Sequence, residues 1–202
     1  MSEFLNGVYE GLINTSPWEG VAVVLSVAYL LLAMRQSLWC WPAAFVSTLI
    51  FAILFFDAAL LMDSVLNGYY LVMAVYGWYV WKYGKTGKES LHVSSWGVSK
   101  NLTIILALGG VSLGFGYVMD TYTHADFAYL DSATTVFAVF TTYMLAQKIL
   151  ENWLYWVVID AVSIYIYIEK AFYLTAALFC LYTVLAVLGF FQWKMTQRTH
   201  ES

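Results

Sequence analysis

The stretch YLVMAVYGWYVWK (residues 70–82) returns 112 residues later, without a gap, as YTVLAVLGFFQWK (residues 182–194). The two copies share a glycine, a tryptophan and a lysine at matching positions, and the same offset pairs a tryptophan with a tryptophan and acidic residues with acidic residues upstream. Apolar helices resemble one another by chance, but one ungapped offset that matches charges, tryptophans and a glycine indicates a duplication. We therefore expect residues 17–82 and 129–194 to be two copies of one unit.

The composition of the chain indicates that lipid is its solvent. Hydrophobic residues make up 62% of the 202 residues and charged residues 11%, and the mean hydropathy is +0.72. A chain of this length cannot hide so many apolar side chains in one core, because much of its surface stays in contact with solvent. The formal net charge of −4 comes without a basic tract, so nucleic-acid binding is excluded. Cys40 and Cys180 lie in apolar runs and are expected to be packing residues, with no metal implied.

Seven apolar stretches are long enough to cross a bilayer as helices. They are residues 18–34, 39–56, 59–81, 98–119, 129–147, 152–168 and 171–193. A three-span copy followed directly by another would leave the second copy inverted, and the fourth span restores a parallel orientation. The predicted fold is an all-α polytopic membrane protein with seven transmembrane helices in a 3+1+3 parallel-repeat arrangement, like that of the SWEET transporters. A substrate site is then expected between the two repeats, near the midplane of the membrane.

The lysines and arginines predict the orientation of the spans. In a seven-span arrangement, eight of the nine basic residues fall on one side, and Lys170 alone falls on the other. The basic side comprises Arg35, Lys82, Lys85, Lys88, Lys100, Lys148, Lys194 and Arg198. Because cytoplasmic loops carry the positive excess, the N-terminus is expected outside and the C-terminus in the cytoplasm.

This orientation divides the chain into expected segments. They are an extracytoplasmic N-terminal segment (1–16), a first three-helix repeat (17–82), a cytoplasmic basic loop with the linker helix (83–119), an extracytoplasmic acidic loop (120–128), a second three-helix repeat (129–194) and a cytoplasmic tail (195–202). The N-terminal segment lacks the basic region and cleavage pattern of a signal peptide, so the first span is expected to remain in the mature protein.

Polar side chains inside the spans are the candidates for a substrate site, because they are costly in lipid and normally face a cavity or the bundle interior. Asp160 lies near the middle of the sixth span, on one helical face with Trp153 and Trp156. No lysine or arginine lies at mid-span to pair with it, so its partners are expected to be amides, hydroxyls, water or a ligand. The candidate substrate-binding residues are Asp63, Asn67, Tyr70, Thr134, Gln147, Asn152, Trp153, Trp156 and Asp160.

Several aromatic and polar residues have a second, purely structural interpretation. Tryptophan is enriched at both membrane interfaces, and the residues expected in such a belt are Trp18, Trp39, Trp78, Trp81, Trp96 and Trp193. Thr134, Thr135 and Ser163 are of the type that lets helices pack closely and hydrogen-bond across an interface. For these three residues, packing and substrate binding both remain open.

The chemistry of the candidate residues indicates the class of ligand. Without a mid-span cation, a phosphate or free carboxylate has no counter-charge. Tryptophan and tyrosine faces attract flat rings and cations, and amides can bond hydroxyls, so a neutral or cationic ring that carries a sugar fits best. A retinal protein is excluded because Lys194 lies only at the end of the last span. Hydrolysis within the membrane is a weak alternative, because all three histidines lie outside the spans.

Two motifs closely resemble the PnuC family of vitamin transporters. They are ENWLYWVVID (residues 151–160), with its W-x-x-W core, and YGWYVW (residues 76–81). The resemblance implies a transporter, not an enzyme, that moves nicotinamide riboside across the bacterial inner membrane by facilitated diffusion, with a cytoplasmic kinase that traps it by phosphorylation. Thiamine, riboflavin and deoxynucleosides are alternative substrates within the family. An intramembrane enzyme or a passive channel is a more distant alternative.

The resemblance also implies roles for single residues. Trp153 and Trp156 would stack near the pyridinium ring of nicotinamide riboside, and Asn67 and Asp160 would contact its amide or ribose. No cofactor is implied. Besides the substrate, the expected partners are the lipid bilayer, the nicotinamide riboside kinase and further copies of the chain in a homo-oligomer.

Overall fold

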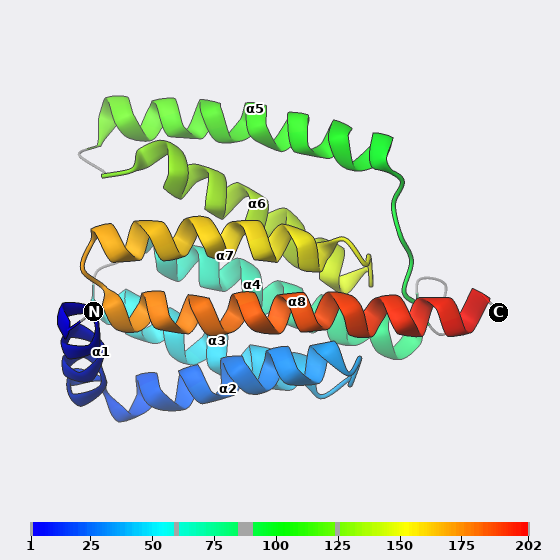
Figure 1. Ribbon diagram of the computed structural model, residues 1–202, viewed down its shortest axis with the longest axis horizontal. Coiled ribbons are helices and arrows are strands. Elements are labelled where there is room, and N and C mark those ends of the chain that lie inside the picture. The colour runs from blue at the N-terminus through cyan, green and yellow to red at the C-terminus, as the bar shows by residue number, and fades with distance from the viewer. Residues whose placement is uncertain (1, 59–60, 85–90, 124–125, 202) are drawn as a thin grey trace.

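The computed structural model describes residues 2–58, 61–84, 91–123 and 126–201, and that part of the chain folds into eight α-helices (Figure 1). The helices are α1 (Ser2–Asn14), α2 (Pro17–Met34), α3 (Cys40–Asp57), α4 (Leu61–Tyr83), α5 (Val98–Tyr122), α6 (Ala128–Ala146), α7 (Asn152–Glu169) and α8 (Tyr173–Glu201). Helices α2 to α8 lie where the seven spans are predicted, although α8 continues past the predicted end. Lys85 and Lys88 of the predicted basic loop lie outside the described residues.

Helix α1 is an addition to the seven helices that the sequence predicts. It has 13 residues, about 20 Å at 1.5 Å per residue, which is too short for a hydrocarbon core of about 30 Å. Figure 1 shows α1 lying across one end of the bundle. Gly7 allows close packing on α8, because a Cβ there would stand 2.1 Å from the ring of Tyr173. A search for long apolar runs does not find α1, because Glu3 and Glu10 interrupt its apolar residues.

The outer surface of the bundle is apolar. Val24, Leu106 and Val158, on three different helices, are 67%, 69% and 64% exposed. By length and composition, α2, α3, α5 and α8 are each apolar enough to cross a membrane. Helices α4, α6 and α7 carry most of the candidate polar residues. A helical bundle with this surface is a membrane protein, because only lipid can solvate so much exposed apolar area.

The two halves of the bundle pack in the same way. Adding 112 to the bounds of α3 gives those of α7, and adding 112 to the first residue of α4 gives that of α8. In each half the helices pack in sequence, α2 on α3 on α4 and α6 on α7 on α8. The halves meet through equivalent helices, because α4 packs on α6 and α8 packs on α2. Helix α5 packs on α6 at the edge of the bundle (Figure 1).

The turn from α2 to α3 and the turn from α6 to α7 have matching backbones. Gln36 and Lys148, which are 112 residues apart, both take a left-handed conformation, with φ of 53° and 52°. The second turn has further support from the linker before α5. Ser94 N donates to Lys148 O at 3.0 Å, and Leu150 N donates to Ser94 O at 2.8 Å. These hydrogen bonds hold the linker to the second half.

Candidate functional site

Four tryptophans close one end of the interior between the two halves, and we call Trp41, Trp81, Trp153 and Trp193 the tryptophan floor. The rings of Trp41 and Trp81 meet edge to face with centroids 5.3 Å apart, and those of Trp153 and Trp193 do so at 5.4 Å. The Trp81 and Trp193 rings, 6.1 Å apart, join the two pairs. The interfacial belt predicted for Trp81 and Trp193 is therefore wrong, because both rings pack inside the bundle. Trp39, which is exposed, fits the belt.

Hydrogen bonds beside the floor link the two halves reciprocally. Trp81 Nε1, in the first half, donates to the carbonyl oxygen of Ala146 in the second half at 3.1 Å. Trp193 Nε1, in the second half, donates to the carbonyl oxygens of Ala33 and Met34 in the first, each at 3.1 Å. The donors are 112 residues apart, and so are the acceptors Met34 and Ala146. These carbonyls end α2 and α6 and have no partner within their own helices.

Two glycines make room for the buried rings. A Cβ on Gly77 would lie 2.3 Å from the Trp41 ring, and one on Gly189 would lie 2.8 Å from the Trp153 ring. The indole N–H groups of Trp41 and Trp153 are buried without a hydrogen-bond partner. Each such group costs about 1–3 kcal/mol, which the close packing of the rings must offset. The floor is thus held by ring contacts and by the two hydrogen-bonded tryptophans.

Lys148 lies beside the floor, in the turn between α6 and α7. Its Nζ donates to Gln36 Oε1 of the matching turn at 3.1 Å and stands 4.7 Å from the centre of the Trp81 ring. The residue is 9% exposed. Burial lowers the pKa of Lys148 to about 8, and the nearby Cys40 thiol opposes this shift. The closed floor therefore holds an ammonium group at an electrostatic cost.

We expect the stability of the closed floor to rise with pH above about 8. Between that pKa and the ordinary value of 10.5, the folded chain binds fewer protons than a state with Lys148 in water, so stability increases with pH. The gain is at most about 3 kcal/mol, at 1.36 kcal/mol for each pKa unit. The thermal unfolding temperature in detergent should rise between about pH 7.5 and about pH 9.5. In the Lys148→Met variant, the contribution of Lys148 to this rise should be absent. An identical pH dependence in both proteins would contradict this account of Lys148.

A second layer lies about two helical turns from Trp153 along α7. We call its members, Ser26, Tyr29, Tyr70, Asp160 and Tyr182, the tyrosine layer. The hydroxyl oxygens of Ser26 on α2 and Tyr182 on α8 are hydrogen-bonded at 2.5 Å, which joins the two halves. Asp160 is 4% exposed, and the Tyr29 ring packs 6.3 Å from the ring of Trp41 in the floor. Tyr70 and Tyr182 are equivalent residues of the two halves.

Asp160 has no cationic partner among the described residues. The ion pair found in that part of the chain joins Lys170 to Asp131, at the far end of the interior. A buried carboxylate without a counter-charge is costly unless a bound group compensates it. The tyrosine layer therefore contains a buried carboxyl group with no cation beside it among the described residues.

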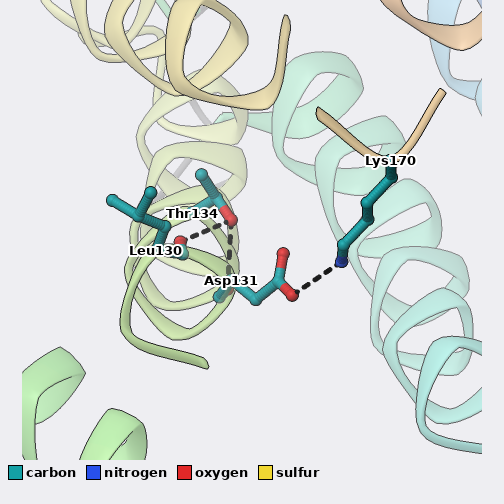
Figure 2. A network of polar contacts seen from close by, with 4 residues as sticks. All are labelled: Leu130, Asp131, Thr134 and Lys170. Atoms are coloured by element: carbon teal, nitrogen blue, oxygen red, sulfur yellow. Dashed lines mark hydrogen bonds and ion pairs between the residues drawn. The ribbon is translucent and has the colours of Figure 1, made fainter. Parts of the chain in front are cut away.

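Figure 2 shows the polar contacts at the end of the interior opposite the floor. Asp131 Oδ2 on α6 pairs with Lys170 Nζ, in the turn between α7 and α8, at 3.2 Å. Thr134 Oγ1 donates to the backbone oxygens of Leu130 and Asp131, both at 3.0 Å. An ion pair thus ties α6 to the α7–α8 turn at this end.

The predicted site residues lie at different levels of the interior. Asp160 and Tyr70 lie in the tyrosine layer. Trp153 lies in the floor and has no exposed surface, and Trp156, about one turn along α7, is partly buried between two apolar clusters. Gln147 Nε2, at the end of α6, donates to Tyr76 Oη at 2.6 Å.

The remaining predicted residues use their polar atoms close to their own positions. Asn67 Nδ2 donates to the backbone oxygen of Asp63 at 2.8 Å. Asn152 Nδ2 donates to the backbone oxygen of Ile149 at 2.6 Å, while its Oδ1 is buried without a partner. Thr134 bonds within α6 and lines a cavity on the outside of the second half. In this conformation the side chains of Asn67, Asn152 and Thr134 therefore hydrogen-bond to nearby backbone oxygens.

Three members of the tyrosine layer are absent from the predicted site. Tyr182 could have been found as the equivalent of Tyr70 in the second repeat. Ser26 and Tyr29 are three residues apart and so share a helical face in the first span. Their hydroxyls are no more polar than those of many interfacial residues, and that weak signal does not separate them from packing residues.

Comparison with known proteins identifies the family. A model of the nicotinamide mononucleotide transporter family matches residues 16–195 of this chain. The chain belongs to this family. The PnuC-type vitamin transporter family predicted from the two tryptophan-rich motifs is thereby confirmed.

Individual relatives are distant but cover nearly the whole chain. The riboflavin/roseoflavin transporter RibM of Streptomyces davaonensis is 24% identical over 182 residues, which cover 88% of this chain and 84% of RibM. The nicotinamide riboside transporter PnuC of Escherichia coli (strain K12) is 22% identical over 209 residues, which cover 91% of this chain and 87% of PnuC. The crystal structure of a vitamin B3 transporter PnuC aligns with a TM-score of 0.76 at 16% identity, over 98% of this chain and 90% of that one. The helical fold is therefore shared with PnuC.

Proposed function

We propose that this protein carries nicotinamide riboside, a precursor for NAD biosynthesis, across the bacterial inner membrane by facilitated diffusion. The substrate would bind in the tyrosine layer between the two halves. The observation that carries the proposal is Asp160, a buried carboxyl group with no cation beside it among the described residues. The pyridinium ring of nicotinamide riboside supplies a positive charge, and aromatic faces attract a flat cation.

The other predicted site residues have supporting roles in this proposal. Trp156 would stack on the ring, because it is partly buried and lies between the floor and Asp160 along α7. Asn67 would reach the amide or ribose after releasing the backbone oxygen of Asp63. Trp153 would form the wall beneath the ring rather than a free stacking face, since the floor already encloses it.

The proposed mechanism is a rocking of the two halves about the tyrosine layer. In this conformation the tryptophan floor closes the end that carries Lys82, Lys148 and Lys194. The excess of basic residues predicts that this end faces the cytoplasm. Opening this end would break the reciprocal hydrogen bonds of Trp81 and Trp193. The substrate would shift the equilibrium between the outward-open and the inward-open state only by the difference between its binding free energies for the two states.

The proposal extends to topology and partners. Helices α2 to α8 would span the membrane in the 3+1+3 SWEET-like arrangement, with the N-terminus outside, α1 on the outer face and the C-terminus in the cytoplasm. The segment boundaries would be those predicted from the sequence. A cytoplasmic kinase would phosphorylate the riboside and so draw uptake forward, and the protein would act as a uniporter within a homo-oligomer.

Riboflavin transport is the second candidate function, and the similarity to RibM favours it. Riboflavin also joins a flat ring to a polyhydroxylated chain, which suits the aromatic and hydroxyl groups of the tyrosine layer. Its ring is neutral, however, and would leave the Asp160 charge uncompensated. The two candidates therefore differ in how strongly binding depends on that carboxylate.

Purified protein in liposomes that contain nicotinamide riboside kinase and ATP tests the proposal. We expect labelled nicotinamide riboside to accumulate saturably and without an ion gradient, while protein-free liposomes with the same contents do not accumulate it. Uptake that depends on a proton or sodium gradient would overturn the uniport mechanism, and uptake without saturation would indicate a channel. A binding titration with nicotinamide riboside, its mononucleotide, thiamine and riboflavin identifies the substrate. Tighter binding of riboflavin would select the second candidate.

A further inference from the structure

A groove on the outside of the second half lies away from the proposed transport path. It lies between α5, α6 and α7, has a volume of about 580 Å³, and we call it the lateral groove. Its lining is largely apolar, with side chains such as Ile105 and Phe137. Leu154 and Val158 of α7 also line it and are both exposed, so the groove opens onto the lipid-facing surface.

A smaller pocket of about 320 Å³ adjoins the lateral groove, and we call it the basic pocket. Lys194 and Arg198 of α8 line it together with Ser95 of the linker before α5. Glu151 and Leu154 line both the pocket and the groove, so the two are continuous at these residues. A cationic cluster therefore stands at one end of an apolar channel.

The charge at this junction is positive. Glu151 is already engaged, because both of its carboxylate oxygens accept from Trp96 N at 3.1 Å and one of them also accepts from Ser95 Oγ. Neither Lys194 nor Arg198 forms an ion pair with a carboxylate among the described residues. The basic pocket thus offers two cationic groups to an anion, with one hydrogen-bonded carboxylate nearby.

We propose that the lateral groove and the basic pocket together bind one membrane phospholipid. Its phosphate would lie between Lys194 and Arg198, and one acyl chain would lie along the groove. Basic pockets on the cytoplasmic side of helical membrane proteins bind anionic head groups, and an apolar groove beside them suits the attached chain. A soluble anion would leave the groove unfilled, and a second copy of this chain would have to bring its own carboxylate to the basic pocket.

The bound lipid would add contacts between elements that the packing of α5 on α6 and the hydrogen bonds of the linker already join. Its acyl chain would fill the space between α5 and α7, and its phosphate would tie α8 to the linker that precedes α5. The lipid would therefore reinforce the attachment of α5 to the second half. This inference rests on the membrane-spanning arrangement and not on the identity of the transported substrate.

Native mass spectrometry of the full-length protein, after incubation with dioleoylphosphatidylglycerol, tests the site. We expect one lipid adduct that survives activation in the wild type and falls at least about fivefold in the double variant Lys194→Gln/Arg198→Gln, because the phosphate loses its cations. Lys82→Gln is the matched control, since Lys82 is the equivalent of Lys194 in the first half. Val158→Trp should fill the groove and remove the same adduct, whereas Val46→Trp, at the equivalent position of α3, should not.

A thermal unfolding assay gives an independent readout. Phosphatidylglycerol should raise the unfolding temperature of the wild type and of Lys82→Gln, and the increase should be absent in the double variant. Equal adducts in the wild type and in both test variants would overturn the proposal. So would a Val158→Trp variant that loses an oligomer and keeps its lipid, because the groove would then be an interface between copies. Transport of nicotinamide riboside is not measured here, so failure of the lipid site leaves the proposed function untouched.

Discussion

Replacing Asp160 by alanine is expected to weaken the binding of nicotinamide riboside about 10- to 100-fold and to abolish saturable uptake. A hydrogen bond or ion contact to a charged group contributes about 1.5–3 kcal/mol, and every 1.4 kcal/mol is a factor of ten in affinity. The carboxyl group of Asp160 has no cationic partner among the described residues, so a cationic ring bound in the tyrosine layer would depend on it. Calorimetric titration and uptake into liposomes measure the two effects.

Two further variants make the Asp160 result specific. Asp160→Asn keeps the size and hydrogen bonding of the side chain, so it should bind more weakly than the wild type and more tightly than the alanine variant. Glu169→Ala removes an exposed carboxylate from the end of the same helix and should leave binding unchanged. A correctly folded Asp160→Ala variant with undiminished affinity would move the substrate out of the tyrosine layer. An asparagine variant that gains affinity for riboflavin would favour the second candidate.

Replacing Gly77 by valine is expected to prevent folding of the bundle. Even a Cβ at this position would lie 2.3 Å from the Trp41 ring, and that ring is fixed by Trp81 on one side and by the helix packing on the other. Added methylenes that a core can accommodate typically destabilise a protein by about 1–3 kcal/mol. At Gly77 the neighbour is the rigid Trp41 ring and not a flexible side chain, so we expect a larger loss of stability. The amount of monodisperse protein in size-exclusion chromatography after membrane extraction measures the loss.

The control for Gly77 lies on the same helix. A Cβ on Gly68 would have no atom within 4 Å, so Gly68→Ala should be neutral or stabilising by up to about 1 kcal/mol through helix propensity. Gly189→Ala should be milder than Gly77→Ala, because its Cβ would stand 2.8 Å rather than 2.3 Å from a tryptophan ring. Equal yields of folded protein from Gly77→Val and Gly68→Ala would contradict the close packing of α4 against the Trp41 ring.

The positions of the long helices could be predicted from the sequence because lipid leaves a chain few alternatives. In lipid, a run of apolar residues bounded by charges must form a helix to satisfy its backbone hydrogen bonds. The span predicted at residues 152–168 accordingly matches helix α7, Asn152–Glu169, to within one residue. Hydropathy does not say which face of a helix is buried. For that reason Trp81 and Trp193, near helix ends, were expected at the interface although both pack inside the bundle.

The candidate site was predictable only where a side chain had no local way to satisfy its polarity. Asp160 stood out because no basic residue lies at mid-span, and the structure places it in the interior. Asn67 and Thr134 are as polar in the sequence, but each finds a backbone oxygen within its own helix. Ser26 contacts Tyr182 of the other half, and Tyr29 packs against Trp41 of the next helix in its own half. Neither contact leaves a local pattern in the sequence.

The exchange of indole donors and carbonyl acceptors between the halves bears on how such a chain could arise. Each half offers the same tryptophan donor and the same helix-end acceptor to the other, Trp81 to Ala146 and Trp193 to Met34. A surface that carries both groups is complementary to itself across a two-fold axis, as in a symmetric dimer. A single ancestral three-helix chain would therefore already have had the means to pair with its twin. In such a history, gene fusion would need only a connecting helix, α5, to make that pairing permanent.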